Sequence, residues 1–325
     1  MALQSSGQIT LKNIKTEFDG DATPTLKEFY RGGSYTTDNN TGVPTSGEIT
    51  LKDFYGAANQ FSYTFSSSTQ EVDLNTTLTT AGWNGSDPVV VTINSGVYLW
   101  SDNTSTGGLT VSSAFNGLLT ITNNGYIIGR GGDVGQAGGP AFVNNATGVT
   151  LINASGAFIA GGGGGGGGRG GGGAGGGNGI GGYRESPPTY YAAGVGGAIG
   201  QNGTNGESGA YSGGSYNGAG LGGGAGGGGA GAEPRTDGYA GYGASGGGGR
   251  VLTVSTSYGQ GAFGGLGDGG TGGSNGNAGS NGTYGGGGGG WGAAGGNSGG
   301  AGGAAISGTA IATYTNNGTV YGSVA

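Results

Sequence analysis

The sequence predicts a mainly β and irregular fold of three consecutive regions, and three observations lead to it. A short motif is repeated within residues 1–60. Apolar and polar side chains alternate, as in β-strands, within residues 61–160. Glycine dominates residues 161–325, in a chain with 94 glycines among 325 residues, where about 7% is usual. We therefore expect a small N-terminal docking module, a stacked β region similar to a β-helix, and a C-terminal bundle of polyglycine II helices.

Residues 1–60 contain two related segments. Residues 6–14 read SGQITLKNI and residues 46–54 read SGEITLKDF, with apolar residues at i, i+2 and i+5 in each. This spacing predicts a short extended start followed by a turn of helix. Residues 23–30, between the two segments, predict a short helix capped by Thr23. Units this small bury little surface alone, so we expect a module that docks on a larger partner, and a small independent domain is the alternative.

A strand–turn–strand unit recurs in residues 61–160. It appears at residues 91–99, 119–128 and 149–159, at a spacing of about 30 residues, with Asn or Ser and Gly at each turn. Repeats of about 20–50 residues are typical of stacked architectures, in which each unit buries its apolar face on the next. The same signature returns at residues 311–321, after the glycine-rich stretch.

The glycine pattern predicts packed helices. Residues 161–168 are consecutive glycines, and glycine recurs at every third residue in residues 200–209 and 273–285. Polyproline II geometry has three residues per turn and no internal hydrogen bonds, so such helices can bond to one another only where their facing residues are glycine. An edge helix then needs glycine at one position in three, and a central helix needs almost only glycine. Disorder is the alternative, because ordering costs glycine the most entropy, but the later strand signature argues against it.

The composition excludes several classes of site. The chain has no cysteine or histidine, which excludes disulfides, Cys/His zinc sites and nucleophiles activated by histidine. A net charge of −7 argues against nucleic acid as a partner. No apolar run is long enough to span a membrane, and the first residues lack the charged and apolar stretches of a secretory signal. We expect no membrane insertion, no cofactor and no metal.

Acidic side chains remain a route to catalysis, because a pair of carboxylates can cleave glycosides. We interpret the scattered acids after residue 60 as solvated surface residues and turn formers, and we expect no enzyme activity. These acids include Asp87, Asp102, Asp133, Glu185, Glu233 and Asp237.

Three segments carry a resemblance to a known family. Residues 121–132 read ITNNGYIIGRGG, residues 152–164 read INASGAFIAGGGG, and residues 316–322 read NNGTVYG. Over roughly residues 115–325 the chain resembles the adhesins at the tips of the long tail fibres of T-even-type bacteriophages. The resemblance implies that the polyglycine II helices form a layered sandwich. It also implies that variable loops at the distal end recognise an outer-membrane protein or lipopolysaccharide.

Residues 1–60 depart from that family. They resemble an N-terminal module of assorted tail and fibre proteins, which implies a mount directly on the virion or on a different fibre. The expected partners are therefore other virion tail or fibre proteins, bound through residues 1–60, and a bacterial surface receptor, either protein or polysaccharide. A homo-oligomer is left open. The chain is expected in the virion, at the tail fibre or tail tip, after synthesis in the host cytoplasm without a signal peptide.

The candidate receptor-binding residues lie in the clusters between glycine runs. Tyrosine supplies large, rigid contact area beside adaptable Ser, Gly and Asn, as in antibody binding sites, and arginine pairs with phosphate or carboxylate. If the chain enters the bundle at its base at Gly161, the first loop, residues 178–193, should be distal. Trp291 is expected to cap the bundle instead. The candidates are Tyr183, Arg184, Tyr190, Tyr191, Tyr211, Tyr216, Arg235, Tyr239, Tyr242 and Tyr258.

Three other functions remain as alternatives to host recognition. The first is a purely structural role in virion or fibre assembly, with the bundle as a rigid cap. Ice binding would need a flat face rich in threonine or alanine, which irregular tyrosine clusters do not offer. A polysaccharide depolymerase would release reducing sugar. Host recognition is favoured because the composition of the loops and the family resemblance agree.

Overall fold

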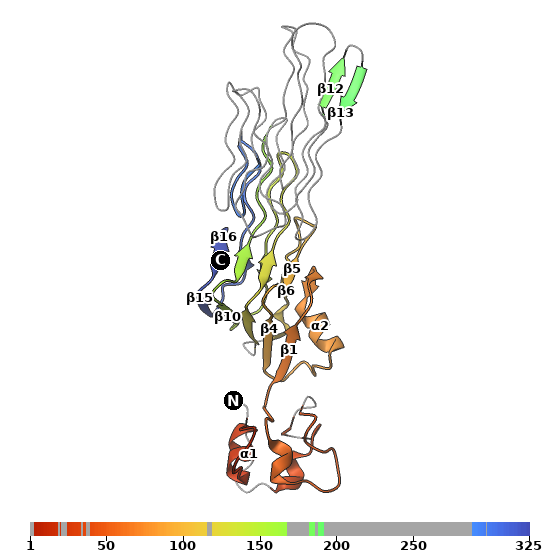
Figure 1. Cartoon of the computed structure of the whole chain (residues 1–325), viewed down its shortest axis with the longest axis vertical. Coiled ribbons are helices and arrows are strands. Elements are labelled where there is room, and N and C mark those ends of the chain that lie inside the picture. The colour runs from red at the N-terminus through yellow and green to blue at the C-terminus, as the bar shows by residue number, and fades with distance from the viewer. Residues whose placement is uncertain are drawn as a thin grey trace.

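The structure is a computed structural model, and Figure 1 shows a long molecule with α1 (Leu11–Glu17) near one end of its long axis. No helix in the part of the chain described is long and apolar enough to cross a membrane. The described residues are 3–18, 20, 25–33, 35–36, 40–115, 119–167, 288–296 and 298–325, with the backbone alone of 182–185 and 188–191.

Three short helices form the N-terminal part of the chain. Each follows a threonine N-cap in extended conformation, a residue type that favours helix starts. The second helix is capped by Thr25 and not by Thr23, because the backbone N–H of Thr25 donates to Glu28 in a capping box, which needs a spacing of three residues. The helices are α1, the 3-10 helix η1 (Leu26–Phe29) and the 3-10 helix η2 (Leu51–Phe54).

Three parallel sheets stack the repeated units of the middle region. Each of the first four units gives one strand to each sheet, so neighbouring strands come from successive units. Along a strand, buried side chains alternate with partly exposed ones, as expected of a strand with one face on a core. The expectation of a mainly β fold is confirmed. The first sheet contains β1 (Phe61–Phe65), β4 (Val89–Ile93), β7 (Leu119–Asn123), β10 (Thr150–Asn153) and β15 (Thr313–Asn316).

The second and third sheets follow the same order. Ile127 pairs with Leu99 on one side and with Ile159 on the other, so one apolar position recurs in each layer. The second sheet contains β2 (Thr69–Gln70), β5 (Tyr98–Trp100), β8 (Tyr126–Ile128), β11 (Phe158–Ala160) and β16 (Thr319–Tyr321). The third contains β3 (Val72–Asp73), β6 (Leu109–Val111), β9 (Phe142–Asn144) and β14 (Ile306–Gly308).

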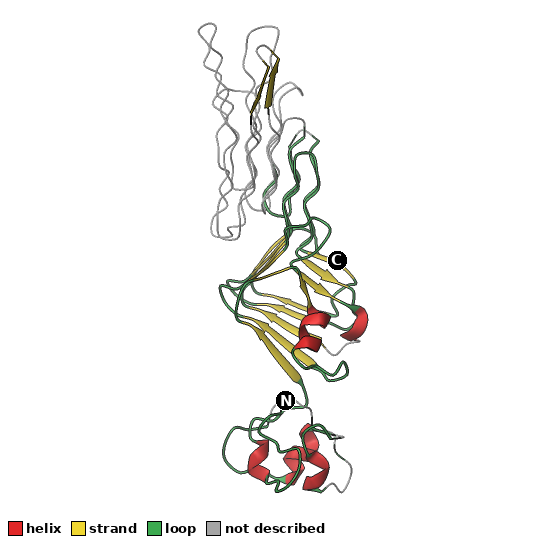
Figure 2. Cartoon of the chain, turned by 90° about the vertical axis from the view of Figure 1, so that its right-hand side faces the viewer, coloured by secondary structure: helices red, strands yellow, loops and turns green. Residues whose placement is uncertain are grey.

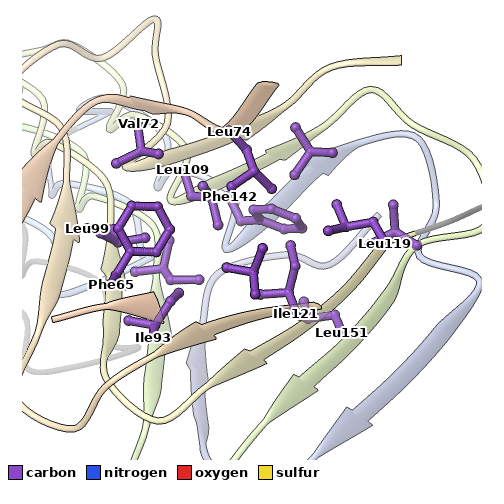
Figure 3. Close-up of a cluster of buried hydrophobic side chains, with 14 of the residues drawn as sticks. Phe65, Val72, Leu74, Ile93, Leu99, Leu109, Leu119, Ile121, Phe142 and Leu151 are labelled. Atoms are coloured by element: carbon purple, nitrogen blue, oxygen red, sulfur yellow. The ribbon is translucent and has the colours of Figure 1, made fainter. Parts of the chain in front are cut away.

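The inner faces of the sheets share one hydrophobic core. Figure 3 shows Ile121 and Leu151 of the first sheet close to Phe142 of the third, with Leu99 of the second nearby. The helix α2 (Leu74–Thr80) packs against β3 and β6 and buries two leucines in the same core. Beside it, the 3-10 helix η3 (Ser113–Phe115) places a phenylalanine ring on Trp83, at 4.8 Å between centroids.

In each unit the connection from the second sheet to the third forms one corner of the stack, and the length of this connection differs between units. The connection from the second sheet to the third is residue 71 in the first unit, residues 101–108 in the second, residues 129–141 in the third and residues 161–305 in the fourth. The long glycine-rich stretch is therefore an insertion in one corner of the fourth unit, whose third strand, β14, follows it. Figure 2 shows loops running away from the strands at one end of the stack.

Candidate functional site

The glycine segments begin where strands of the second sheet end. Residues 129–141 leave the end of β8, and residues 161–167 leave the end of its parallel neighbour β11. From Gly129 to Gly135, every third backbone N–H donates to a carbonyl of residues 160–166. These hydrogen bonds run from Gly129 to Ala160 (2.9 Å), from Gly132 to Gly163 (2.8 Å) and from Gly135 to Gly166 (3.0 Å).

Residues 160–167, the central segment, also bond to the chain on other sides. One partner is the returning half of residues 129–141, and another is the stretch at residues 288–303. The central segment therefore bonds to several neighbours at once. These bonds run from Gly162 to Gly139 (2.9 Å), from Gly165 to Gln136 (2.9 Å), from Gly300 to Gly165 (2.8 Å), from Gly303 to Gly162 (2.7 Å), from Gly289 to Gly164 (2.7 Å) and from Gly164 to Ala293 (2.8 Å).

The close approach of these backbones requires glycine. A Cβ atom on Gly162 would lie 1.8 Å from the carbonyl oxygen of Arg130, and one on Gly165 would lie 1.9 Å from that of Asp133. A neighbouring segment shows the same limit, since a Cβ on Gly138 would lie 2.0 Å from the oxygen of Gly162. Any side chain at these positions must push two backbones apart.

Trp291 is buried where the glycine segments leave the second sheet. Its side chain is 4% exposed and packs with Ile128 and Ala160, the last residues of β8 and β11. Partly buried aromatic side chains of the second sheet surround this cluster. Trp291 was expected to cap the glycine bundle, and it is buried where the described glycine segments meet the second sheet. It fixes the base of the segments against the sheet.

Two ladders of side chains, one on the first sheet and one on the second, connect neighbouring units of the stack. The amide of Asn123 donates to Asn153 (2.9 Å), and the amide of Asn153 donates to Asn316 (2.8 Å). Asn123 and Asn153 are fully buried, so each amide needs these partners. On the second sheet the rings of Tyr98 and Tyr126 stack with centroids 4.6 Å apart. Burial, and next the nearby Tyr126, raise the pKa of Tyr98 above its usual 10.0.

Four candidate receptor-binding residues lie on one hairpin. Tyr183 and Arg184 are in β12 (Gly182–Glu185), and Tyr190 and Tyr191 are in β13 (Pro188–Tyr191). The two strands are antiparallel and place the backbones of Tyr183 and Tyr190 opposite each other. In Figure 1 this hairpin lies at the end of the molecule away from α1. The other six candidates, Tyr211, Tyr216, Arg235, Tyr239, Tyr242 and Tyr258, lie outside the described residues.

The acidic residues considered for catalysis lie in different parts of the chain. Asp133 pairs with Arg130 at 2.8 Å, and Glu185 is at the far end of the molecule in β12. Glu233 and Asp237 lie outside the described residues. No three acidic side chains gather closely enough to hold a metal ion within the described ranges.

One part of this site was missed from the sequence. Residues 129–141 were assigned to the β region, but they pack as a glycine segment against residues 160–167. The signal was present, because Gly129, Gly132, Gly135 and Gly138 follow one another at every third position. This glycine period was not recognised because it is short and lies between two clear strand patterns.

Comparison with known proteins gives a family. A family model described as the phage tail fibre adhesin Gp38 matches residues 60–226. A solved structure, the crystal structure of the gp37–gp38 adhesin tip complex of the bacteriophage S16 long tail fibre, aligns over 100% of both chains, with 20% identity and a TM-score of 0.36. No match was found among curated proteins.

Proposed function

The chain belongs to the phage tail fibre adhesin Gp38 family, and from this premise we propose that it recognises a receptor on the bacterial surface. Recognition takes place through loops at the end of packed glycine segments. The observation that carries the proposal is the hairpin β12–β13, which holds four tyrosine and arginine candidates at the end of the molecule away from α1. The chain acts in the virion, at the tail fibre or tail tip, and has no catalytic role.

The proposed architecture has three parts. Residues 1–60 dock on the virion or fibre, residues 61–160 form a β-helix-like stack, and residues 161–325 form a polyglycine II sandwich with receptor-binding loops and a closing strand. Hydrogen bonds at every third residue between residues 129–135 and 160–166 support polyglycine II geometry, which has three residues per turn. The shared strand order of the parallel sheets supports the β-helix-like stack.

A rigid base suits recognition by short loops. Packed segments whose hydrogen bonds join them on several sides provide a rigid support for the binding residues, and preorganisation of this kind lowers the entropy lost on contact. Tyrosine and arginine then supply the large contacts that dominate binding energy in protein interfaces. The receptor is a protein or a polysaccharide of the outer surface.

The test measures binding of the labelled full chain to a panel of intact bacterial strains. The variant Y190A/Y191A should bind the recognised strains about tenfold or more weakly, as expected when central aromatic contacts are lost. T189A changes the same strand without removing an aromatic ring and should bind within about twofold of the unchanged chain. Absence of strain-selective binding by the unchanged chain would favour a purely structural role in the virion.

A further inference from the structure

The outer face of the second sheet carries a row of aromatic side chains. Tyr98 begins β5, Tyr126 begins β8 and Phe158 begins β11, and the parallel register pairs each with the next. The residue that follows each of them along its strand is buried in the core, so the three rings lie on the opposite face of the sheet. Tyr98 and Tyr126 are therefore neighbouring tyrosines whose positions the strand register fixes.

The two tyrosine rings form the closest contact in this row. Their centroids are 4.6 Å apart, with 29° between the ring planes. The next contacts, from Tyr126 to Phe158 and from Phe158 to Tyr321, are longer, at 5.5 and 6.4 Å. Tyr98 and Tyr126 thus make a pair of stacked phenols, and the ring on the far side of Tyr126 has no hydroxyl.

The hydroxyl ends of the pair lie at the same side. Side chains at paired positions of neighbouring parallel strands leave the backbone in the same direction, so two equal rings lie alongside each other with their tips together. Burial raises the pKa of Tyr98, and the nearby Tyr126 raises it further, as expected when two phenol oxygens are close. The ring carbons next to the two hydroxyls are then also neighbours.

Both rings are open to small reagents in solution. Each is partly exposed on the outer face, while its inner side packs on the cluster of Ile128, Ala160 and Trp291. A phenol gives up one electron and one proton to an oxidant more readily than a phenylalanine ring gives up an electron. Oxidation of the pair therefore produces two radicals that face each other.

We propose that Tyr98 and Tyr126 form a site of oxidative cross-linking, at which a haem peroxidase with hydrogen peroxide joins the two rings as dityrosine. Each phenol loses one electron and one proton, and the two radicals form a carbon–carbon bond between the positions next to their hydroxyls. The hydrogen on each of these carbons then moves to the oxygen of its ring, which restores both phenols. The peroxide takes up the two electrons and two protons and becomes two molecules of water.

The cross-link ties neighbouring units of the stack together covalently. β5 and β8 are adjacent strands of the second sheet and come from successive units, and the chain has no cysteine with which to form a disulfide. A bond between residues 98 and 126 restricts the unfolded chain, as a disulfide between the same positions would. Oxidation of this site therefore stabilises the stack, whichever receptor the chain recognises.

The experiment treats the dilute, folded full chain with a haem peroxidase and hydrogen peroxide, and maps dityrosine by fluorescence and by mass spectrometry of proteolytic peptides. We expect one linked pair of peptides that contains residues 98 and 126 and weighs two hydrogens less than its parts. Y98F and Y126F should each remove this pair. Y63F is the matched control and should retain it, because Tyr63 is partly exposed on another sheet with its ring on Phe65.

Unfolding tests whether the strand register is the cause. In concentrated urea the chain keeps its tyrosines but loses their pairing, so the link between residues 98 and 126 should fall to the level of other tyrosine pairs. The cross-linked chain should unfold several degrees higher than the untreated chain, whereas treated Y98F should show no such shift. Dityrosine mainly at other pairs, an equal yield of this link in urea, or an unchanged unfolding temperature of the linked chain overturns the inference.

Discussion

At the scale of single residues, a ladder of three asparagines, of which Asn123 and Asn153 are buried, connects the later units of the stack. Asn153 donates to Asn316 and accepts from Asn123. The sequence shows these residues as turn formers, because asparagine before glycine is typical of turns. Nothing in a single sequence separates an asparagine exposed in a turn from one buried in a ladder. The ladder becomes visible only in the strand register of the structure, which pairs Asn153 with Asn123 on one side and with Asn316 on the other.

We expect N153A to destabilise the stack by about 1–3 kcal/mol, because the buried amide of Asn123 loses the acceptor that Asn153 supplies. Equilibrium unfolding in urea measures the change. Asn94 occupies the exposed turn of the second unit, so N94A is the control and should alter the free energy of unfolding little. Equal effects of the two substitutions would show that the ladder contributes nothing.

A second prediction at this scale concerns alkaline pH. Burial raises the pKa of Tyr98 and of Tyr314 above 10.0 in the folded chain. The unfolded chain therefore releases these protons first, so stability is kept below pH 10 and falls as the pH rises through the raised values. Unfolding midpoints measured from about pH 9 to 11.5 should decline, and the decline should be shallower in Y98F/Y314F. The same slope in the variant and the unchanged chain would contradict the assignment.

At the scale of elements, the sequence predicted the first two strands of the later units but missed the third. Strands such as β3 and β6 have two or three residues, too few for alternation to be recognised. The helix α2 was missed because threonine-rich sequence favours strands, although Leu74 and Leu78 have helical spacing and are both buried. Residues 25–29, which also begin with Thr-Leu-Lys, were not recognised as related to residues 10–14 and 50–54, because no Ser-Gly pair precedes them.

At this scale, we predict that a side chain added within the packed glycine segments destabilises the fold. G162A should lower the free energy of unfolding by about 3 kcal/mol, the upper part of the usual range for overpacking, because its Cβ would lie 1.8 Å from the oxygen of Arg130. A301S is the matched control, since Ala301 is exposed in a neighbouring segment. Thermal unfolding of both variants measures the difference. A neutral G162A would mean that the segments are not held this closely together.

At the scale of the whole molecule, the two proposed interaction surfaces lie at opposite ends. The N-terminal helix α1 is near one end and the hairpin β12–β13 is at the other, with the stacked sheets between them (Figure 1). All of the long insertion leaves one corner of one unit and returns to the same stack, where β14 pairs with β9. The insertion can therefore vary in sequence without changing the strands that carry it.

The central claim is that the loops of the glycine insertion decide which bacteria are recognised. The most direct measurement exchanges residues 178–258 for those of a family member from a phage with a different host range, and determines the host range of particles that carry the exchanged chain. The account predicts that the host range follows the donor of the loops, whereas exchange of residues 61–115 leaves it unchanged. Particles that keep their original host range with foreign loops, while the chain is incorporated normally, would contradict the account.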